Sequence, residues 1–139
     1  MKSSPELEQN REIIARAFDD WREGRGGPYD LLADDVEWTI TGHSMVAKTY
    51  PSRESFLRDV IHPFNARMRT PLVPTVRNLY ADGSTVVAFF DAGGTARDGV
   101  AYSNTYAWFL EMRRGRIVRA HAFFDSIVFD AFWQRVTPS

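Results

Sequence analysis

The sequence predicts an α+β fold in which a curved antiparallel sheet packs on N-terminal helices and encloses an apolar, cone-shaped pocket. The first half of the chain carries apolar residues at helical spacing, whereas from Pro71 to Phe124 apolar and polar residues alternate with a period of two. A last apolar stretch is long enough for one closing helix. Helices segregated from an antiparallel run of strands are typical of an α+β layer architecture.

Two helices are expected around one strand in the first half. Ser4-Pro5-Glu6 is a typical helix start, with a capping hydroxyl, proline at the first helical position and an acid in the first turn. Glycines in the stretch 24–27 end this helix. A short helical turn at 28–32 leads to a strand at 36–40 and an irregular stretch at 41–51. Ser52 can cap the second helix, and Pro63 should end or kink it because proline cannot donate the helical hydrogen bond.

Turn residues divide the second half into a four-strand meander. Asp-Gly and Arg-Gly turns fall at 81–84 and 113–115, and further glycines lie between 93 and 99. The predicted strands span residues 72–80, 85–92, 101–112 and 116–124, and the closing helix spans 127–136. No repeat or linker interrupts this order, so residues 1–139 are expected to form a single domain.

Composition excludes several classes of function. The net charge of −1 offers no basic excess for nucleic-acid binding, and the absence of cysteine excludes disulfides, thiol nucleophiles and thiolate metal sites. No stretch is apolar enough to span a membrane, so a soluble cytoplasmic protein is expected. The aromatic fraction of 14% fits either a filled core or an aromatic-lined pocket, and composition does not separate them.

Two acids are the main catalytic candidates. Asp125 follows an apolar strand directly before a helix, and Asp91 ends another strand in apolar surroundings. If both face the pocket, desolvation and mutual repulsion raise the pKa of at least one, which separates a proton donor from an acceptor. The alternative is that Asp125 caps the following helix and that Asp91 faces solvent or pairs with Arg97 or Arg119.

Strand alternation supplies a candidate pocket wall. Tyr102, Asn104, Tyr106 and Trp108 share one face of their strand and could hold a substrate oxygen, although a dimer face or ordinary core would have the same pattern. Trp38 could complete the wall. Three further residues are candidates. His121 shares the face of Asp125 and could be a general base, or only a structural residue. His43 and Tyr50 lie in the loop that is expected at the pocket mouth. The three histidines lack metal-ligand spacing, so no metal site is expected.

The motifs Asp34-Asp35-Val36-Glu37-Trp38 and Phe123-Phe124-Asp125, with the element order above, resemble the nuclear transport factor two-like superfamily. The nearest branch is similar to the SnoaL-like polyketide cyclases, with limonene epoxide hydrolase and ketosteroid isomerase as relatives. The resemblance implies a cone-shaped pocket, homodimers joined through the sheets, and Asp125 as an acid/base. It also aligns the Arg-x-Asp of the epoxide hydrolases with Phe89-Phe90-Asp91, where Phe89 replaces the arginine. Thr39-Ile40-Thr41 lacks the base of the isomerases.

The leading interpretation is a cofactor-independent acid/base enzyme of isomerase, cyclase or hydratase type. It would act on a small apolar molecule that bears a carbonyl or hydroxyl group, with Asp125, Asp91 and His121 catalytic and the aromatic wall, including Phe89, binding the substrate. A non-catalytic binding protein that uses the same cavity is the alternative, and a protein-interaction module with a filled cone is the third. The expected partners are a small apolar ligand and a second copy of the chain, without nucleic acid or membrane.

Overall fold

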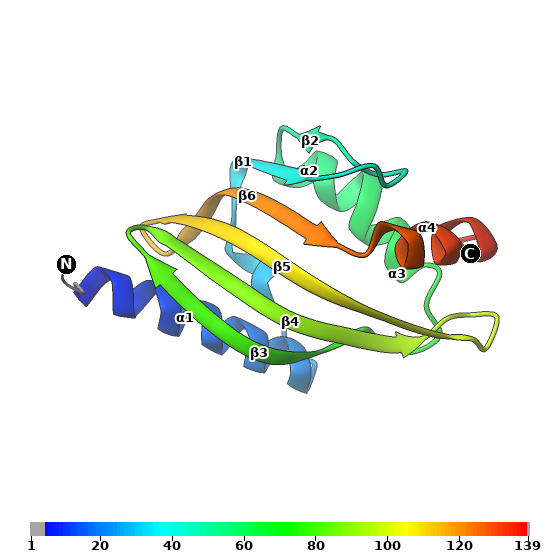
Figure 1. Cartoon of the computed structure of the whole chain (residues 1–139). Helices are drawn as coiled ribbons and strands as arrows, with labels where there is room; N and C mark the ends of the chain where they lie inside the picture. Colours follow the sequence, from blue (N-terminus) through cyan, green and yellow to red (C-terminus); the bar gives the residue numbers. More distant parts are fainter. Residues whose placement is uncertain (1–4, 139) are drawn as a thin grey trace.

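A computed structural model describes residues 5–138 of the chain (Figure 1). The fold class is α+β, as predicted, with one six-stranded sheet in the order β2-β1-β6-β5-β4-β3. The helical elements are α1 (Pro5–Glu23), the 3-10 turn η1 (Pro28–Leu31), α2 (Arg53–Phe56), the π-type turn η2 (Leu57–Ile61), α3 (His62–Asn65) and α4 (Ser126–Arg135). The strands are β1 (Leu32–Ile40), β2 (Thr49–Tyr50), β3 (Val73–Asp82), β4 (Thr85–Thr95), β5 (Ala101–Arg113) and β6 (Arg116–Phe124).

The sheet is open, curved and mixed. The meander β3 to β6 is antiparallel throughout, but β1 pairs with β6 in parallel, so the expectation of a purely antiparallel sheet is wrong at this one pair. The reason is the chain order: the helical stretch and the meander separate β1 from β6, and such a long connection allows parallel pairing. β2 lies within the stretch expected to be irregular and pairs with the end of β1.

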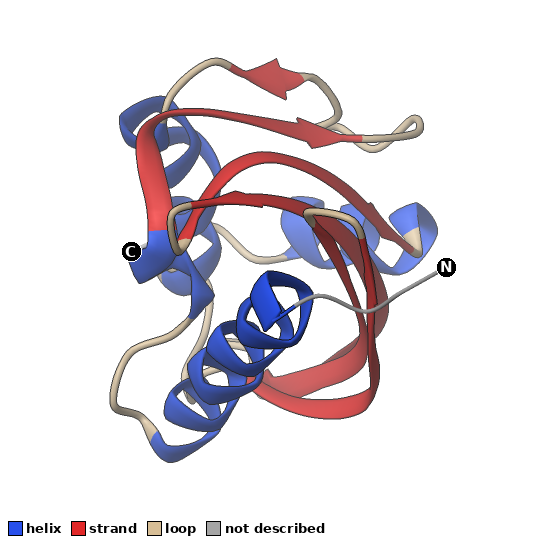
Figure 2. Ribbon diagram, turned by 90° about the vertical axis from the view of Figure 1, so that its left-hand side faces the viewer, coloured by secondary structure: helices blue, strands red, loops and turns tan. Residues whose placement is uncertain are grey.

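The helices cover the concave side of the sheet. Figure 2 shows α1 lying along the inside of the curve, where it packs against β3 and β4. The burial of alternate residues along β4 and β5 places the core between this concave face and the helices. Trp38, Phe18 and Phe90 are among its largest fully buried side chains. The opposite, convex face of the sheet carries the more exposed members of the same alternation, both polar and aromatic.

Pro63 neither ends nor breaks the second helix. Helical structure continues from Arg53 to Asn65 because a π-type turn precedes the proline. The N–H of His62 donates to the carbonyl of Leu57, five residues back, and this wider turn makes room for the proline ring. The N–H of Ala66 then donates to the carbonyl of His62 at 2.9 Å, so α-helical bonding resumes.

The strand β4 is longer than predicted because its glycines belong to the strand rather than to a loop. A Cβ on Gly94 would lie 2.8 Å from the Met68 methyl carbon and 2.9 Å from the Pro71 carbonyl oxygen. Glycine at this position therefore lets the segment after α3 cross close to the sheet. That crossing segment forms one side of the site described next.

Candidate functional site

A small cavity of about 50 Å³ lies between the concave face of the sheet and the helices. Its wall is aromatic and aliphatic, and within residues 5–138 it contains no carboxylate and no imidazole. Tyr29 and Tyr106 bring the only hydroxyl groups to this lining. The remaining lining residues are Trp21, Trp38, Ile40, Phe56, Val60, Ile61, Phe64, Leu72, Trp108, Ala122, Phe124 and Phe129.

A chain of hydrogen-bonded polar groups reaches the cavity from the inward face of β5. The hydroxyls of Tyr102 and Tyr106 lie 2.8 Å apart, and Nδ2 of Asn104 donates to the Tyr102 hydroxyl at 3.0 Å. The Asn104 side chain also exchanges two hydrogen bonds with the backbone of Asp125, both 3.1 Å, and so joins β5 to the start of α4. The result is a continuous polar chain that reaches the cavity wall at Tyr106.

Both tyrosines of this chain stay protonated at neutral pH. Burial raises the pKa of Tyr102 to about 12, and burial with the neighbouring Tyr102 raises the pKa of Tyr106 well above its usual range. A neutral hydroxyl can donate a hydrogen bond to a carbonyl or hydroxyl oxygen. The chain of hydroxyls is therefore suited to hold a ligand oxygen and not to accept a proton.

Trp38 and Trp108 lie on the inner face, as the sequence indicated. The Trp38 ring stacks on Phe56 with centroids 4.5 Å apart and meets the Trp108 ring edge-on at 5.1 Å. The burial pattern of β5 likewise turns Tyr102, Asn104 and Tyr106 inward. A substrate-binding role for these five residues stays a prediction.

Asp91 does not face the cavity, so the predicted acid pair is wrong. Phe90 points into the core, and strand alternation turns Asp91 to the convex face, where it accepts hydrogen bonds from Arg77 at 2.8 and 3.0 Å and from the Thr105 hydroxyl at 2.6 Å. These bonds, Arg77 first, lower the pKa of Asp91. Phe89 is also outside the cavity, with the Arg77 guanidinium 4.9 Å from its ring centre.

Asp125 caps α4 instead of lining the cavity. Its Oδ1 accepts the backbone N–H groups of Ile127 at 3.0 Å and Val128 at 3.2 Å, and the residue is exposed. Free N–H groups at a helix start attract such a carboxylate, so the capping alternative is the one observed. Two aspartates on different surfaces cannot share a proton.

The three remaining candidates also lie away from the cavity. His121 is exposed because Ala120 and Ala122, its neighbours on β6, face inward. His43 is exposed in the loop before β2. Tyr50 is buried, but its hydroxyl donates to the Val46 carbonyl at 2.6 Å and its ring packs on Phe56.

Comparison with known proteins identifies the family. A family model described as the SnoaL-like domain matches residues 12–120, most of the chain. The chain belongs to this family. A search of curated proteins finds no significant match.

Solved structures agree with the SnoaL-like fold at low sequence identity. A protein proposed to be a SnoaL-like polyketide cyclase from Jannaschia sp. CCS1 is 16% identical and has a TM-score of 0.73, and the match covers 93% of this chain and 94% of that one. TerC, co-crystallised with polyporic acid, is 20% identical and has a TM-score of 0.69, and the match covers 90% of this chain and 98% of TerC. A protein proposed to be a ketosteroid isomerase from Kribbella flavida DSM 17836 is 24% identical and has a TM-score of 0.58, and the match covers 86% of this chain and 80% of that one.

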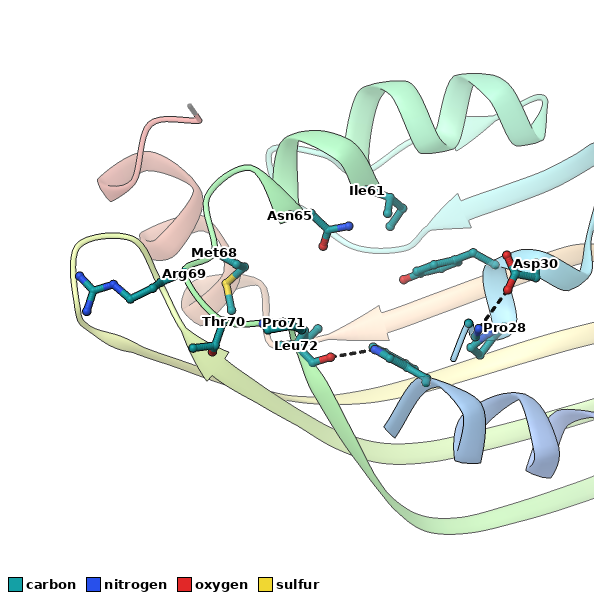
Figure 3. Close-up of a pocket in the computed structure, with 13 residues that line it drawn as sticks. Pro28, Asp30, Ile61, Asn65, Met68, Arg69, Thr70, Pro71 and Leu72 are labelled. Carbon is teal, nitrogen blue, oxygen red and sulfur yellow. Dashed lines mark hydrogen bonds between the residues drawn. The ribbon is translucent and has the colours of Figure 1, made fainter. Parts of the chain in front are cut away.

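An open cleft of about 500 Å³ adjoins the cavity of this SnoaL-like chain. Pro28 and Asp30 line one side, and Ile61, Asn65 and the segment 68–72 line the other (Figure 3). The cleft and the cavity share four lining residues, Trp21, Tyr29, Ile61 and Leu72. The cavity and the cleft are therefore adjacent, and within the described part of the chain no residue of the 41–51 loop lines either of them.

Sequence reasoning missed the residues between cleft and cavity. Tyr29 follows a glycine-rich turn, and Ile61 and Leu72 flank Pro63 and Pro71. The available signal was an aromatic residue on a short turn directly after a group of glycines. Within residues 5–138 no group of His, Asp and Glu side chains converges as a metal site requires, and no helix is long and apolar enough to cross a membrane.

Proposed function

We propose that the cavity binds a small, flat, mostly apolar molecule and that Tyr106 donates a hydrogen bond to its carbonyl or hydroxyl oxygen. The observation that carries this proposal is the buried Tyr106 at the wall of a mostly apolar cavity, with its hydroxyl 2.8 Å from that of Tyr102 behind the wall. Ligand sites combine mainly apolar walls with a few placed polar groups. A buried donor held by its neighbours selects ligands that can accept its hydrogen bond.

Binding is better supported than carboxylate-based catalysis. A general base must lie within hydrogen-bond reach of the proton that it removes. Asp91, Asp125 and His121 are all outside the cavity, and the raised pKa of Tyr106 keeps its hydroxyl protonated at neutral pH. A cofactor-independent acid/base mechanism that uses these three residues is therefore not part of the proposal.

A second candidate is an isomerase or cyclase in which Tyr106 stabilises a developing oxyanion. Tyr102 and Asn104 support it, because the Asn104 amide donates to the Tyr102 hydroxyl and that hydroxyl is hydrogen-bonded to Tyr106. Preorganised donors stabilise such charge. The likeness to proteins proposed to be cyclases and isomerases points the same way.

Replacement of Tyr106 by phenylalanine tests the proposal. The change removes one hydroxyl and keeps the ring, so binding of 2-naphthol, followed by quenching of tryptophan fluorescence, should weaken about 3- to 10-fold, the equivalent of one hydrogen bond. Naphthalene, which lacks the oxygen, should bind both proteins equally. The matched control is Tyr80→Phe on the exposed side of β3. Equal affinity of the wild type and Tyr106→Phe for 2-naphthol would refute the role of Tyr106.

Catalysis is assessed with the same variant. A panel of aromatic ketones and phenols is incubated with the wild type in deuterated water. NMR follows hydrogen exchange at the carbon α to the carbonyl group of each ketone and at the ring carbon ortho to the hydroxyl group of each phenol. Exchange by the wild type that is lost in Tyr106→Phe supports the second candidate. Binding without exchange supports the binding function alone.

We also propose that the chain forms a homodimer through the convex face of the sheet. Phe109 and Phe123 lie there with ring centroids 5.8 Å apart, and 41% and 43% of their surfaces are exposed. Contiguous exposed aromatic residues are typical of interaction surfaces. We expect Phe109→Glu to convert a dimer into a monomer in sedimentation velocity, while Val100→Glu, at an equally exposed residue in the turn before β5, leaves the dimer intact. A monomeric wild type would contradict this proposal.

A further inference from the structure

The cavity is too small for the ligand that its chemistry suits. Pockets for small molecules usually have volumes of about 300–1,000 Å³, whereas this cavity has about 50 Å³ and the cleft outside it about 500 Å³. The apolar wall and the tyrosine pair lie at the small inner space, and the room lies at the cleft. Some part of the boundary between them must therefore move before a flat molecule can reach Tyr106.

Tyr29 occupies the place that a flat ligand would take. Four aromatic rings surround its own, with centroids 5.7 Å away for Phe56, 5.8 Å for Trp108, 6.0 Å for Trp38 and 6.3 Å for Trp21. The side chain lines both the cleft and the cavity. Its hydroxyl makes no hydrogen bond to any residue in the described part of the chain, although the hydroxyls of the core pair are bonded. The ring is therefore held by edge-on and tilted packing against its aromatic neighbours, without a hydrogen bond from its hydroxyl.

Glycines and a single short turn carry Tyr29. Gly24 and Gly26 have φ values of 77° and 135°, in the left-handed region that favours glycine. After them, η1 is a single turn closed by Oδ2 of Asp30, which accepts the Gly27 N–H at 3.1 Å. A second bond joins the two sides of the boundary, because the Trp21 indole donates to the Leu72 carbonyl at 2.8 Å. Figure 3 shows both bonds as dashed lines at the cleft.

We propose that Tyr29 is an internal gate whose ring fills the ligand site in the closed state. Opening of the turn at Gly27 withdraws the ring into the cleft, and the flat ring of a ligand then takes its place among Trp21, Trp38, Phe56 and Trp108. The ligand oxygen reaches the Tyr102–Tyr106 pair, which the Tyr29 hydroxyl does not bind. This inference rests on the proposed binding function and adds the conformational step that controls it.

The gate predicts a kinetic signature. In stopped-flow mixing with 2-naphthol, read out by tryptophan fluorescence, the observed rate of the wild type should level off at high probe concentration, because opening becomes limiting. The rate of Tyr29→Ala should rise linearly over the same range, and its affinity should be at least about 10-fold tighter because no closed state competes with the probe. Tyr80→Ala, which removes an exposed tyrosine from β3, should behave as the wild type.

A second variant covers the case in which Tyr29→Ala does not fold, as judged by circular dichroism. Asp30→Ala removes the bond to Gly27 and keeps the Tyr29 ring, so the limiting rate should rise at least about threefold, the effect of one lost hydrogen bond. Two outcomes overturn the gate and leave the binding function standing. The first is an observed binding rate of the wild type that rises linearly with probe concentration. The second is a Tyr29→Ala variant that binds the probe more tightly while the limiting rate of Asp30→Ala equals that of the wild type. Absence of binding to the wild type and to both variants overturns both proposals.

Discussion

Replacement of Arg67 by methionine is expected to lower the free energy of unfolding by about 3 kcal/mol, because each hydrogen bond from a charged group contributes about 1.5–3 kcal/mol. Arg67 is only 8% exposed, and its guanidinium donates to the carbonyls of Val136 at 2.7 Å, Trp133 at 3.1 Å and Pro63 at 3.0 Å. It also lies 3.8 Å from the centre of the Trp133 ring. Loss of these contacts frees the end of α4 from the segment after α3.

The measurement is urea unfolding followed by circular dichroism. Arg97→Met is the matched control, because Arg97 is exposed and donates to the neighbouring Thr137 carbonyl at 2.9 Å. We expect its loss to stay below about 1 kcal/mol, as for most surface changes. An equal loss in the two variants would contradict the structural role assigned to the buried guanidinium. The loss in the free energy of unfolding for Arg67→Lys should lie between those of Arg67→Met and Arg97→Met, since lysine keeps the charge but not the planar guanidinium.

The fold was predictable because its signals are local and repeated. Alternation along 101–112 and 116–124 determined the strands and, for Tyr102 to Trp108, the inward face. The parallel pairing of β1 with β6 was not predictable in this way, because it joins segments far apart in the chain. Nor was the π-type turn before Pro63, which depends on how the surrounding structure accommodates a proline inside a helix.

The site was predictable on one side only. Strand alternation placed the tyrosine pair inward, and the same rule, applied from Phe90, would have turned Asp91 outward. The error at Asp125 has another origin: a carboxylate between a strand and a helix fits a cavity floor and a helix cap equally well, and the free N–H groups of α4 favour the cap. Tyr29 was missed because its position depends on rings from four other elements, α1, β1, α2 and β5.

Replacement of Trp108 by alanine is expected to have the largest effect of all on stability, a loss of about 3–5 kcal/mol, as for other large aromatic residues in cores. Trp108 is 3% exposed and lies at the centre of the aromatic cluster, with its ring 4.8 Å from Phe90, 5.1 Å from Trp38 and 6.1 Å from Trp21, on which it stacks. Thermal and urea unfolding measure the loss, and Tyr80→Ala on the outer surface should lose less than about 1 kcal/mol.

Indole provides the test that separates a hole from a general loss of structure. If Trp108→Ala keeps the surrounding rings in place, it leaves a hole of the shape of the missing side chain, and added indole should fill it and raise the unfolding temperature by mass action. The increase should exceed that of the wild type and of Trp108→Phe, whose rings still occupy most of the space. An indole response in Trp108→Ala no larger than that of the wild type would mean that the cluster collapses into the vacancy. The aromatic wall would then be a deformable core, and the tyrosine pair behind it would have no rigid cavity in which to select a ligand.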